Sequence, residues 1–150
     1  MNLFTQQFQA FLTAFGAGRK MVLSTSVNGL VSSRMMSVVR IGETFFFQTD
    51  TALRKYRQLA ANPNAALCID NIQIEGSCKE LGHPLGHPDF CAAFRACFPG
   101  SFDAYTALEQ ERLFSLTPRR IERWIYRDGV PHIETFDMET QQYRFEKYAD

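Results

Sequence analysis

The chain has 150 residues, 45% of them hydrophobic, and its 16 Lys and Arg residues balance its 16 Asp and Glu residues. This size and hydrophobic content predict a single domain, residues 1–150. Without a global positive field, we expect neither nucleic acid nor a membrane as a partner. The longest apolar runs fall short of the roughly 20 residues that span a bilayer, and the N-terminus does not resemble a signal peptide, so we expect a cytoplasmic protein.

The first part of the chain predicts one helix followed by a series of antiparallel strands. Aromatic residues recur at helical spacing over residues 3–15, which indicates an amphipathic helix. Residues 20–50 contain three β-rich runs, separated by the turn-forming pair Asn28-Gly29 and by a turn near Gly42. A second helix is predicted over residues 51–61. It should end there because the residue before Pro63 avoids helical angles.

The second part adds more strands and short helices. Strands are predicted at residues 65–71 and 72–81, short helices at 89–97 and 103–111, a hairpin within 119–138 and a last strand at 142–148. Sequential strands linked by hairpins, with few helices between them, favour an antiparallel barrel. We therefore expect a mainly β fold, a barrel of six or seven strands with small helical caps.

A cluster of polar residues marks the passage from the third strand to the second helix. Thr49 and Thr51 could donate hydroxyl hydrogen bonds there, and Arg54 and Lys55 follow within one turn. The N-terminus of a helix stabilises anions, and two cations could complete a phosphate site. The alternative is a solvated helix face, and the charges alone do not decide between the two.

The second strand also carries a charge where a barrel core is expected. Arg34 shares one face of this strand with Met36 and Val38, whereas Met35, Ser37 and Val39 share the other. An unpaired buried charge costs several kcal/mol, so Arg34 needs an acceptor or an anion. Two interpretations remain open: a planar hydrogen-bonding ligand, or a structural ion pair with one of three carboxylates, Asp50, Asp70 or Glu75.

The stretch "SSRMMSVVRIGETFFFQTDTALRKYRQLAANPNAAL" resembles the core of the pyridoxamine 5′-phosphate oxidase-like, FMN-binding split-barrel superfamily. It has the arginine-bearing strand, the aromatic strand that ends in threonine and the lysine in the first turn of the helix. Its Q-L-x-x-N-P exit, Gln58 to Pro63, is similar residue for residue. The similarity extends more loosely over about residues 8–82, and residues 119–134 are similar to the closing strands. The resemblance implies an antiparallel split β-barrel.

The resemblance also implies a ligand and the residues that hold it. The ligand would be FMN, bound between the subunits of a homodimer. The implied contacts run along the second strand, the end of the third strand, the start of the second helix and one later turn: Arg34, Met35, Met36, Ser37, Val38, Val39, Gln48, Thr49, Thr51, Arg54, Lys55 and Asn71. Arg54 and Lys55 would hold the phosphate.

One departure from the family limits the implied activity. The oxidase that gives the family its name grips its vitamin substrate with C-terminal Trp-Arg-Leu and Arg-x-His motifs, and this chain ends in "QQYRFEKYAD". The resemblance therefore implies an FMN-dependent oxidoreductase that uses a nicotinamide donor or another small molecule, not a true pyridoxamine 5′-phosphate oxidase. A non-catalytic flavin carrier, or a split barrel that binds deazaflavin or haem, remains an alternative.

Other polar and aromatic features are given structural interpretations. His83 and His87 are four residues apart, but the two prolines of "GHPLGHP" exclude a shared helix, so we expect no metal site. We expect this segment, with Phe90, to cover the flavin. The four cysteines lack metal-site or C-x-x-C spacing and are expected to be reduced core residues.

Overall fold

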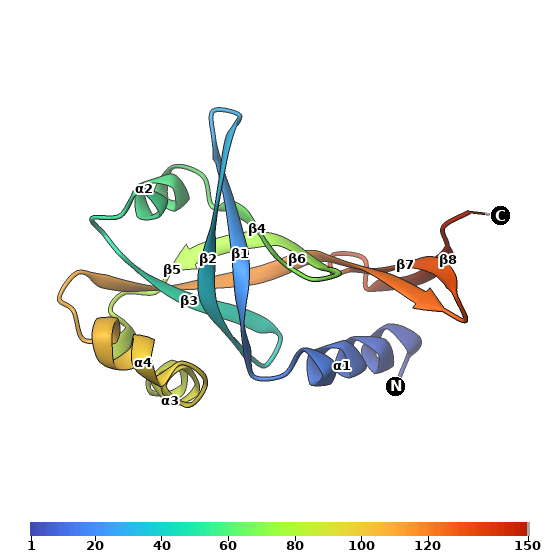
Figure 1. Ribbon diagram of the computed structural model, residues 1–150, viewed down its shortest axis with the longest axis horizontal. Coiled ribbons are helices and arrows are strands. Elements are labelled where there is room, and N and C mark those ends of the chain that lie inside the picture. Colours follow the sequence, from blue (N-terminus) through green and yellow to red (C-terminus); the bar gives the residue numbers. More distant parts are fainter. Residues whose placement is uncertain (150) are drawn as a thin grey trace.

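The computed structural model describes residues 1–149 as a mainly β protein, with 50% of the chain in strands and 28% in helices. Six antiparallel strands form a barrel in the order β3-β2-β1-β4-β5-β6, closed by pairing between β3 and β6. Two further strands, β7 and β8, extend the sheet beyond β6 (Figure 1). The predicted antiparallel split barrel of six or seven strands is confirmed, with six strands in the barrel and two more beyond it.

The elements follow one another in the order shown by the colours of Figure 1. The strands are β1 (Gly18–Val27), β2 (Leu30–Ile41), β3 (Thr44–Asp50), β4 (Asn64–Ile69), β5 (Ile72–Glu80), β6 (Glu111–Arg127), β7 (Val130–Asp137) and β8 (Gln142–Lys147). The helices are α1 (Leu3–Phe15), α2 (Arg54–Ala61), the 3₁₀ turn η1 (Pro84–Gly86), α3 (Pro88–Cys97), α4 (Pro99–Ser101) and the π-helix η2 (Phe102–Thr106).

Helix α1 has the predicted bounds and closes one end of the barrel. Asn2 caps it, because its Oδ1 accepts a hydrogen bond of 2.9 Å from the backbone N–H of Thr5. Its phenylalanines pack around Phe136 of β7, with the rings of Phe8 and Phe11 each 5.7 Å away between centroids. The apolar face predicted from the amphipathic pattern is therefore the face that α1 buries against the sheet.

The hairpin of β1 and β2 turns at the predicted Asn28-Gly29. Both residues have positive φ, 51° and 78°, which suits the two-residue turn that joins twisted antiparallel strands. Past the hairpin, β2 buries its two faces in different cores. Val38 points into the barrel, whereas Val39 packs outside it, against Phe94 of α3.

The predicted helix over residues 103–111 is correct only as far as Thr106, where the π-helix η2 ends, and the long strand β6 starts at Glu111. The start of β6 was missed because it is buried on both faces: Leu113 packs under α3, and Phe114 and Leu116 pack inside the barrel. A strand buried on both sides lacks the polar alternation that identifies strands in a sequence.

The cysteines have differing surroundings. Cys78 lies in the barrel core, as predicted, whereas Cys68 on β4 is exposed, which contradicts its assignment to the core. Across residues 1–149, every helix is too short or too polar to cross a bilayer.

Candidate functional site

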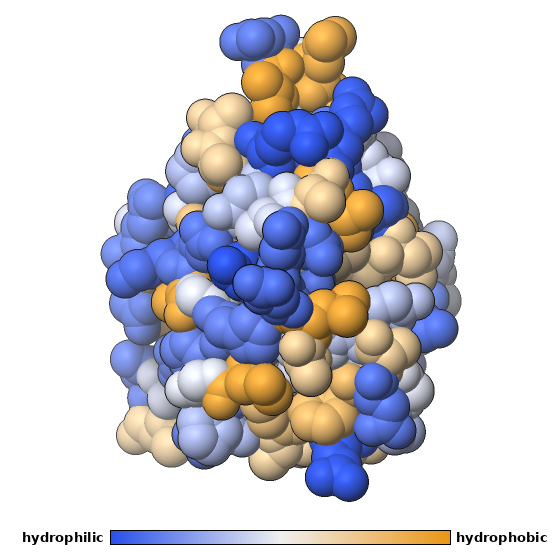
Figure 2. All heavy atoms as spheres, turned by 90° about the vertical axis from the view of Figure 1, so that its left-hand side faces the viewer, coloured by the Kyte–Doolittle hydropathy of each residue, from blue (hydrophilic) through white to orange (hydrophobic). Residues whose placement is uncertain are grey.

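Two hollows flank the first turn of α2. The larger one, here called the large pocket, has a volume of about 510 Å³ and lies between β2, β3, α2, α3 and the segment that leads to β6. Its lining residues are Met35, Met36, Ser37, Gln48, Thr49, Asp50, Ala52, Leu53, Lys55, Phe94, Ser101, Tyr105, Leu108 and Glu111. Figure 2 faces the side of the molecule that carries α2, where hydrophilic residues surround separate hydrophobic patches.

Thr49 has an unused hydroxyl group at the wall of the large pocket. Its side chain is 2% exposed, and its Oγ1 has no hydrogen-bond partner among residues 1–149. A buried hydroxyl without a partner costs about 1–3 kcal/mol. The neighbouring Gln48 differs, because its Oε1 accepts a hydrogen bond of 3.1 Å from Thr106. Thr49 is among the lining residues of the large pocket, and its buried hydroxyl has no partner among the described residues.

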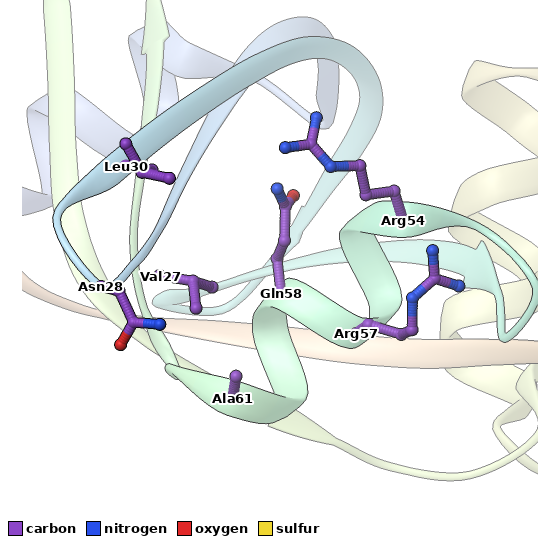
Figure 3. Close-up of a pocket in the computed structure, with 7 residues that line it drawn as sticks. All are labelled: Val27, Asn28, Leu30, Arg54, Arg57, Gln58 and Ala61. Carbon is purple, nitrogen blue, oxygen red and sulfur yellow. The ribbon is translucent and has the colours of Figure 1, made fainter.

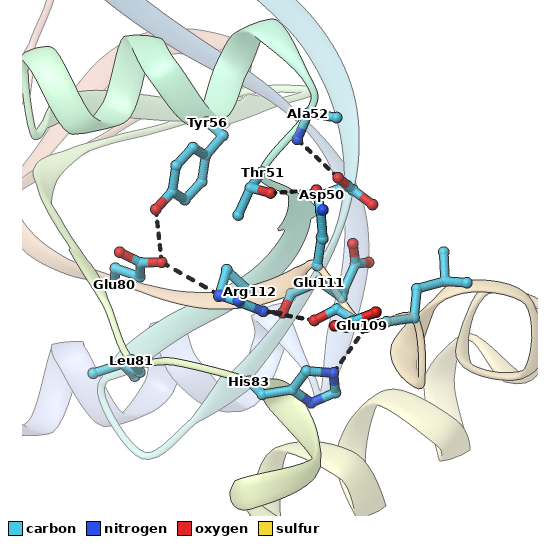
Figure 4. Close-up of polar contacts among 12 residues, drawn as sticks. Asp50, Thr51, Ala52, Tyr56, Glu80, Leu81, His83, Glu109, Glu111 and Arg112 are labelled. Carbon is cyan, nitrogen blue, oxygen red and sulfur yellow. Dashed lines mark hydrogen bonds and ion pairs between the residues drawn. The ribbon is translucent and has the colours of Figure 1, made fainter.

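The turn between β3 and α2 is held by its own polar contacts. Asp50 Oδ1 accepts from the backbone N–H of Ala52 at 2.8 Å, and Thr51 Oγ1 donates to Gln110 Oε1 at 2.8 Å (Figure 4). Helix α2 starts at Arg54, three residues later than predicted, and no side chain caps it. Thr51 thus stabilises the turn and is absent from the lining of the large pocket.

The two predicted phosphate ligands line different hollows. Lys55 lines the large pocket, whereas Arg54 lines a groove of about 360 Å³ between α2 and the β1–β2 hairpin. We call it the hairpin groove, and its lining consists of Val27, Asn28, Leu30, Arg54, Arg57, Gln58 and Ala61 (Figure 3). The two cations still follow each other on one turn, so a ligand at that turn could reach both.

Arg34 uses neutral acceptors rather than the ion pair considered from the sequence. Its Nη1 donates to Leu23 O at 3.1 Å and to Thr25 Oγ1 at 2.9 Å, and its Nη2 donates to Gln58 Oε1 at 2.6 Å. No carboxylate among the described residues forms an ion pair with it. The interpretation as an ion pair with Asp50, Asp70 or Glu75 is therefore wrong.

The positive charges around the first turn of α2 are mutually unfavourable. Burial, and then the charge of Arg54, lowers the pKa of Arg34. Burial, and then the charge of Arg34, lowers the pKa of Lys55, and the charge of Glu111 opposes this shift. Within residues 1–149, none of these three cations lies within 4.0 Å of a carboxylate oxygen. An anion bound beside them would relieve their repulsion.

The remaining predicted site residues fall into three groups. Met35, Met36 and Ser37 line the large pocket with Gln48, Thr49 and Lys55. Val38 and Val39 are fully buried in the cores on either side of β2. Asn71 lies in the turn after β4, where its Nδ2 donates to Trp124 O at 2.8 Å, and it lines a separate hollow. The structure brings half of the predicted residues together at one pocket.

The "GHPLGHP" segment does not cover the large pocket. His83 Nε2 lies 2.8 Å from Leu108 O, and His87 Nε2 lies 2.8 Å from Leu81 O. The cover comes instead from Phe94, Tyr105 and Leu108. His83 therefore contributes to the large pocket only indirectly, because its contact with the backbone of Leu108 holds that covering residue in place. The described residues contain no group of three or more side chains suited to hold a metal ion.

Glu111, which the sequence did not single out, is the buried acid of the large pocket. Its side chain is 4% exposed, and it pairs across the sheet with Asp50. Burial, and then the charge of Asp50, raises the pKa of Glu111 to about 7, and Lys55 opposes this shift. A single glutamate after "EQ" in a polar stretch carries no sequence signal of burial.

Comparison with known proteins identifies the family. The sequence profile described as "Pyridoxamine 5'-phosphate oxidase" matches residues 4–125. The chain belongs to the pyridoxamine 5′-phosphate oxidase family. No protein of curated function matches the sequence.

Solved structures with this fold include proteins with different ligands. A pyridoxamine 5′-phosphate oxidase-related, FMN-binding protein from Nostoc punctiforme shares 16% identity at a TM-score of 0.64, over 98% of this chain and 93% of its own. PhzG from Burkholderia lata, in complex with tetrahydrophenazine-1-carboxylic acid, shares 16% identity at a TM-score of 0.64, over 97% of this chain and 90% of its own. A haem-binding protein from Mycobacterium smegmatis shares 14% identity at a TM-score of 0.68, over 94% of this chain and 60% of its own. At these identities the likeness shows the fold.

Proposed function

We propose that this member of the pyridoxamine 5′-phosphate oxidase family binds FMN at the large pocket and acts as an FMN-dependent oxidoreductase on a small molecule. The observation that carries the proposal is the group of three cations, Arg34, Arg54 and Lys55, that lack a carboxylate partner among the described residues. A phosphate supplies the missing negative charge. The unpartnered hydroxyl of Thr49 adds a hydrogen bond for the same ligand.

Each part of the pocket has a distinct task in this proposal. FMN supplies the hydride or electron transfer, and the protein supplies orientation, charge and exclusion of water. Lys55, with Arg54 at the same turn, holds the phosphate. Thr49 orients the ligand through its hydroxyl. Apolar side chains such as Phe94 and Leu108 provide the walls for a planar ring.

The chemistry of the lining favours FMN over haem. A haem iron is held by a strong axial ligand, most often a histidine or a cysteine thiolate. No histidine or cysteine occurs in the lining of the large pocket within residues 1–149. His83 and His87 direct a ring nitrogen at backbone carbonyl oxygens instead. A dianionic phosphate, by contrast, matches the charges that are present.

Titration of the purified protein with FMN and riboflavin tests the proposal. The phosphate should add at least about 1.5–3 kcal/mol of binding free energy, the range for a hydrogen bond to a charged group. Lys55→Ala should lower the affinity for FMN and leave the affinity for riboflavin unchanged. Lys79→Ala, which removes an exposed lysine on β5, is the matched control and should change neither. Equal affinity of the wild-type protein for FMN and riboflavin would contradict the phosphate site.

Rapid mixing of the FMN-loaded protein with NADH or NADPH separates an enzyme from a carrier. An oxidoreductase that takes electrons from a nicotinamide should lose its flavin absorbance in a saturable way. Reduction by dithionite but by neither nicotinamide would favour the carrier, or an enzyme with a different donor.

The proposed functional unit is a homodimer whose second subunit covers the large pocket. Large apolar side chains at the pocket are exposed in the single chain: Met35 55%, Leu53 46%, Tyr105 55% and Leu108 46%. A planar apolar ring would remain open to water at such a rim. Burial of the rim by a second copy would stabilise both the dimer and the bound ring.

A further inference from the structure

The carboxyl group of Glu111 lies in the same pocket as the proposed phosphate ligand Lys55. Glu111 is the first residue of β6, and its register partner in β3 is Asp50. Its neighbour Arg112 faces the other side of the strand, since side chains alternate, and there it contacts Glu80 at 3.9 Å (Figure 4). Arg112 is therefore not available as a counter-ion for the Glu111 carboxylate inside the pocket.

The Glu111 carboxylate has no partner of its own. Its side chain is 4% exposed and lines the large pocket, and no hydrogen bond or ion pair reaches its carboxylate oxygens from the residues that the structure describes. An ionised carboxylate in this position is poorly solvated. The charged groups around it are Asp50 from β3, which disfavours ionisation, and Lys55 from α2, which favours it.

A bound anion changes the balance at Glu111. The charge of Lys55 is the one nearby influence that supports the ionised form of Glu111. A phosphate next to Lys55 would neutralise that support and add its own repulsion. The protonated acid, in contrast, has an O–H group that can donate a hydrogen bond to an oxygen or ring nitrogen of the ligand.

We propose that Glu111 is a ligand-binding residue that contacts the anionic ligand of the large pocket in its protonated form, so that binding takes up a proton from solution. The proton comes from the solvent and adds to a Glu111 carboxylate oxygen, and no covalent bond to the ligand forms. The inference rests on the proposed function, because FMN is the anion. It also adds to ligand specificity. The protonated carboxyl group favours ligands with hydrogen-bond acceptors, and its ionisation at alkaline pH disfavours anionic ones.

Calorimetric titration with FMN in two buffers of different ionisation enthalpy tests the inference. At pH 7, the wild-type protein should take up about half a proton more per FMN than Glu111→Gln does, since a group with a pKa of about 7 is half ionised there. Between pH 7 and pH 8.5, wild-type affinity for FMN should fall about tenfold relative to that of Glu111→Gln. The comparison between variants cancels the titration of the FMN phosphate itself.

Glu109→Gln is the matched control, because Glu109 is exposed and lies outside the lining of the large pocket. It should take up the same number of protons as the wild-type protein. Tight FMN binding with the same proton count in wild type and Glu111→Gln would overturn the inference and leave the proposed function intact. No binding of FMN by the wild-type protein would overturn both.

Discussion

Removal of the Thr49 hydroxyl should have different effects on the free energy of unfolding and on the affinity for FMN. Replacement by valine keeps the shape of the side chain and removes a buried group that has no partner among the described residues. Thr49→Val should therefore keep the free energy of unfolding or raise it by about 1 kcal/mol, because no unpaired hydroxyl remains. Affinity for FMN should fall by about 1 kcal/mol. Urea unfolding of the free protein and FMN titration measure the two effects.

The control for Thr49 is Thr25, which is equally buried but fully engaged. Its Oγ1 donates to Gln58 and accepts from Arg34. Thr25→Val should lower the free energy of unfolding by about 1–2 kcal/mol, since two polar partners are left behind. If Thr49→Val destabilises the free protein as much as Thr25→Val does and spares FMN affinity, the Thr49 hydroxyl has a structural role.

Glu111 predicts a pH dependence of stability even without a ligand. Its folded-state pKa of about 7 lies above the ordinary value of 4.5. The folded state therefore binds the proton more tightly, so this stabilising contribution is complete below about pH 4.5 and is lost as pH rises through 7. Relative to Glu111→Gln, the wild-type protein should lose on the order of 2 kcal/mol of unfolding free energy, a figure reduced for solvent in the pocket.

Urea unfolding at intervals between pH 4.5 and pH 8 measures this difference for Glu111. The difference between the wild-type protein and Glu111→Gln cancels the other titrating groups, apart from coupling to Asp50 and Lys55. Glu109→Gln should follow the wild-type curve. A difference that stays constant across this pH range would show that Glu111 is an ordinary solvated carboxylate.

The positions of single residues were predictable from the sequence where they depend only on neighbouring elements of the chain. Thr49 and Lys55 were identified because a strand ends and a helix begins between them, and both line the large pocket. Arg34 was recognised as needing partners, but Thr25 and Gln58 supply them from other elements. Glu111 was missed because its burial depends on β3, α2 and α3, which lie far from it in the sequence.

The Gln58 to Pro63 motif has a structural meaning at the level of elements. Gln58 Oε1 accepts from Arg34 and Thr25, and its Nε2 donates to Ser32 at 3.1 Å. Asn62 Nδ2 donates to Ser26 O at 2.9 Å. The motif therefore fastens α2 to the β1–β2 hairpin and fixes the position of the helix that carries Arg54 and Lys55.

Loss of the Gln58 amide should loosen α2 as an element. Gln58→Leu leaves the partly buried Arg34 without one of its acceptors, so the free energy of unfolding should fall by about 2 kcal/mol. Amide hydrogen exchange in α2 should accelerate more than exchange in β5. Arg57→Gln, on the exposed side of the same helix, should change stability by less than about 0.5 kcal/mol. Unchanged exchange in α2 would mean that Leu59 and the backbone suffice to hold it.

Elements with a clear periodicity or turn signal were predictable, and the start of β6 was not. The phenylalanine pattern of α1 gave its exact bounds, and the Asn28-Gly29 turn located the first hairpin. Residues 112–118 of β6 were assigned to no element, because Leu113 and Phe114 point into two different cores and leave no polar alternation. The extra strand pairing between β3 and β6 closes the barrel, and such long-range pairing has no local signature.

At the scale of the whole molecule, the exposed apolar rim of the large pocket predicts a second copy of the chain. Leu53, at 46% exposure, lies on this rim and does not belong to the barrel core. In sedimentation velocity at micromolar concentration, absorbance of bound FMN should move with a species of twice the 17.2 kDa chain mass. Leu53→Arg should shift the protein toward the monomer and weaken FMN together with it, because a charged side chain at the rim would be buried by the partner. Leu3→Arg, on α1 at the other end of the molecule in Figure 1, changes a leucine that is more exposed, at 58%, and should leave the dimer intact. A monomer that binds FMN as tightly as any dimer would contradict a site shared between subunits, because the rim would then be open to water without loss of affinity.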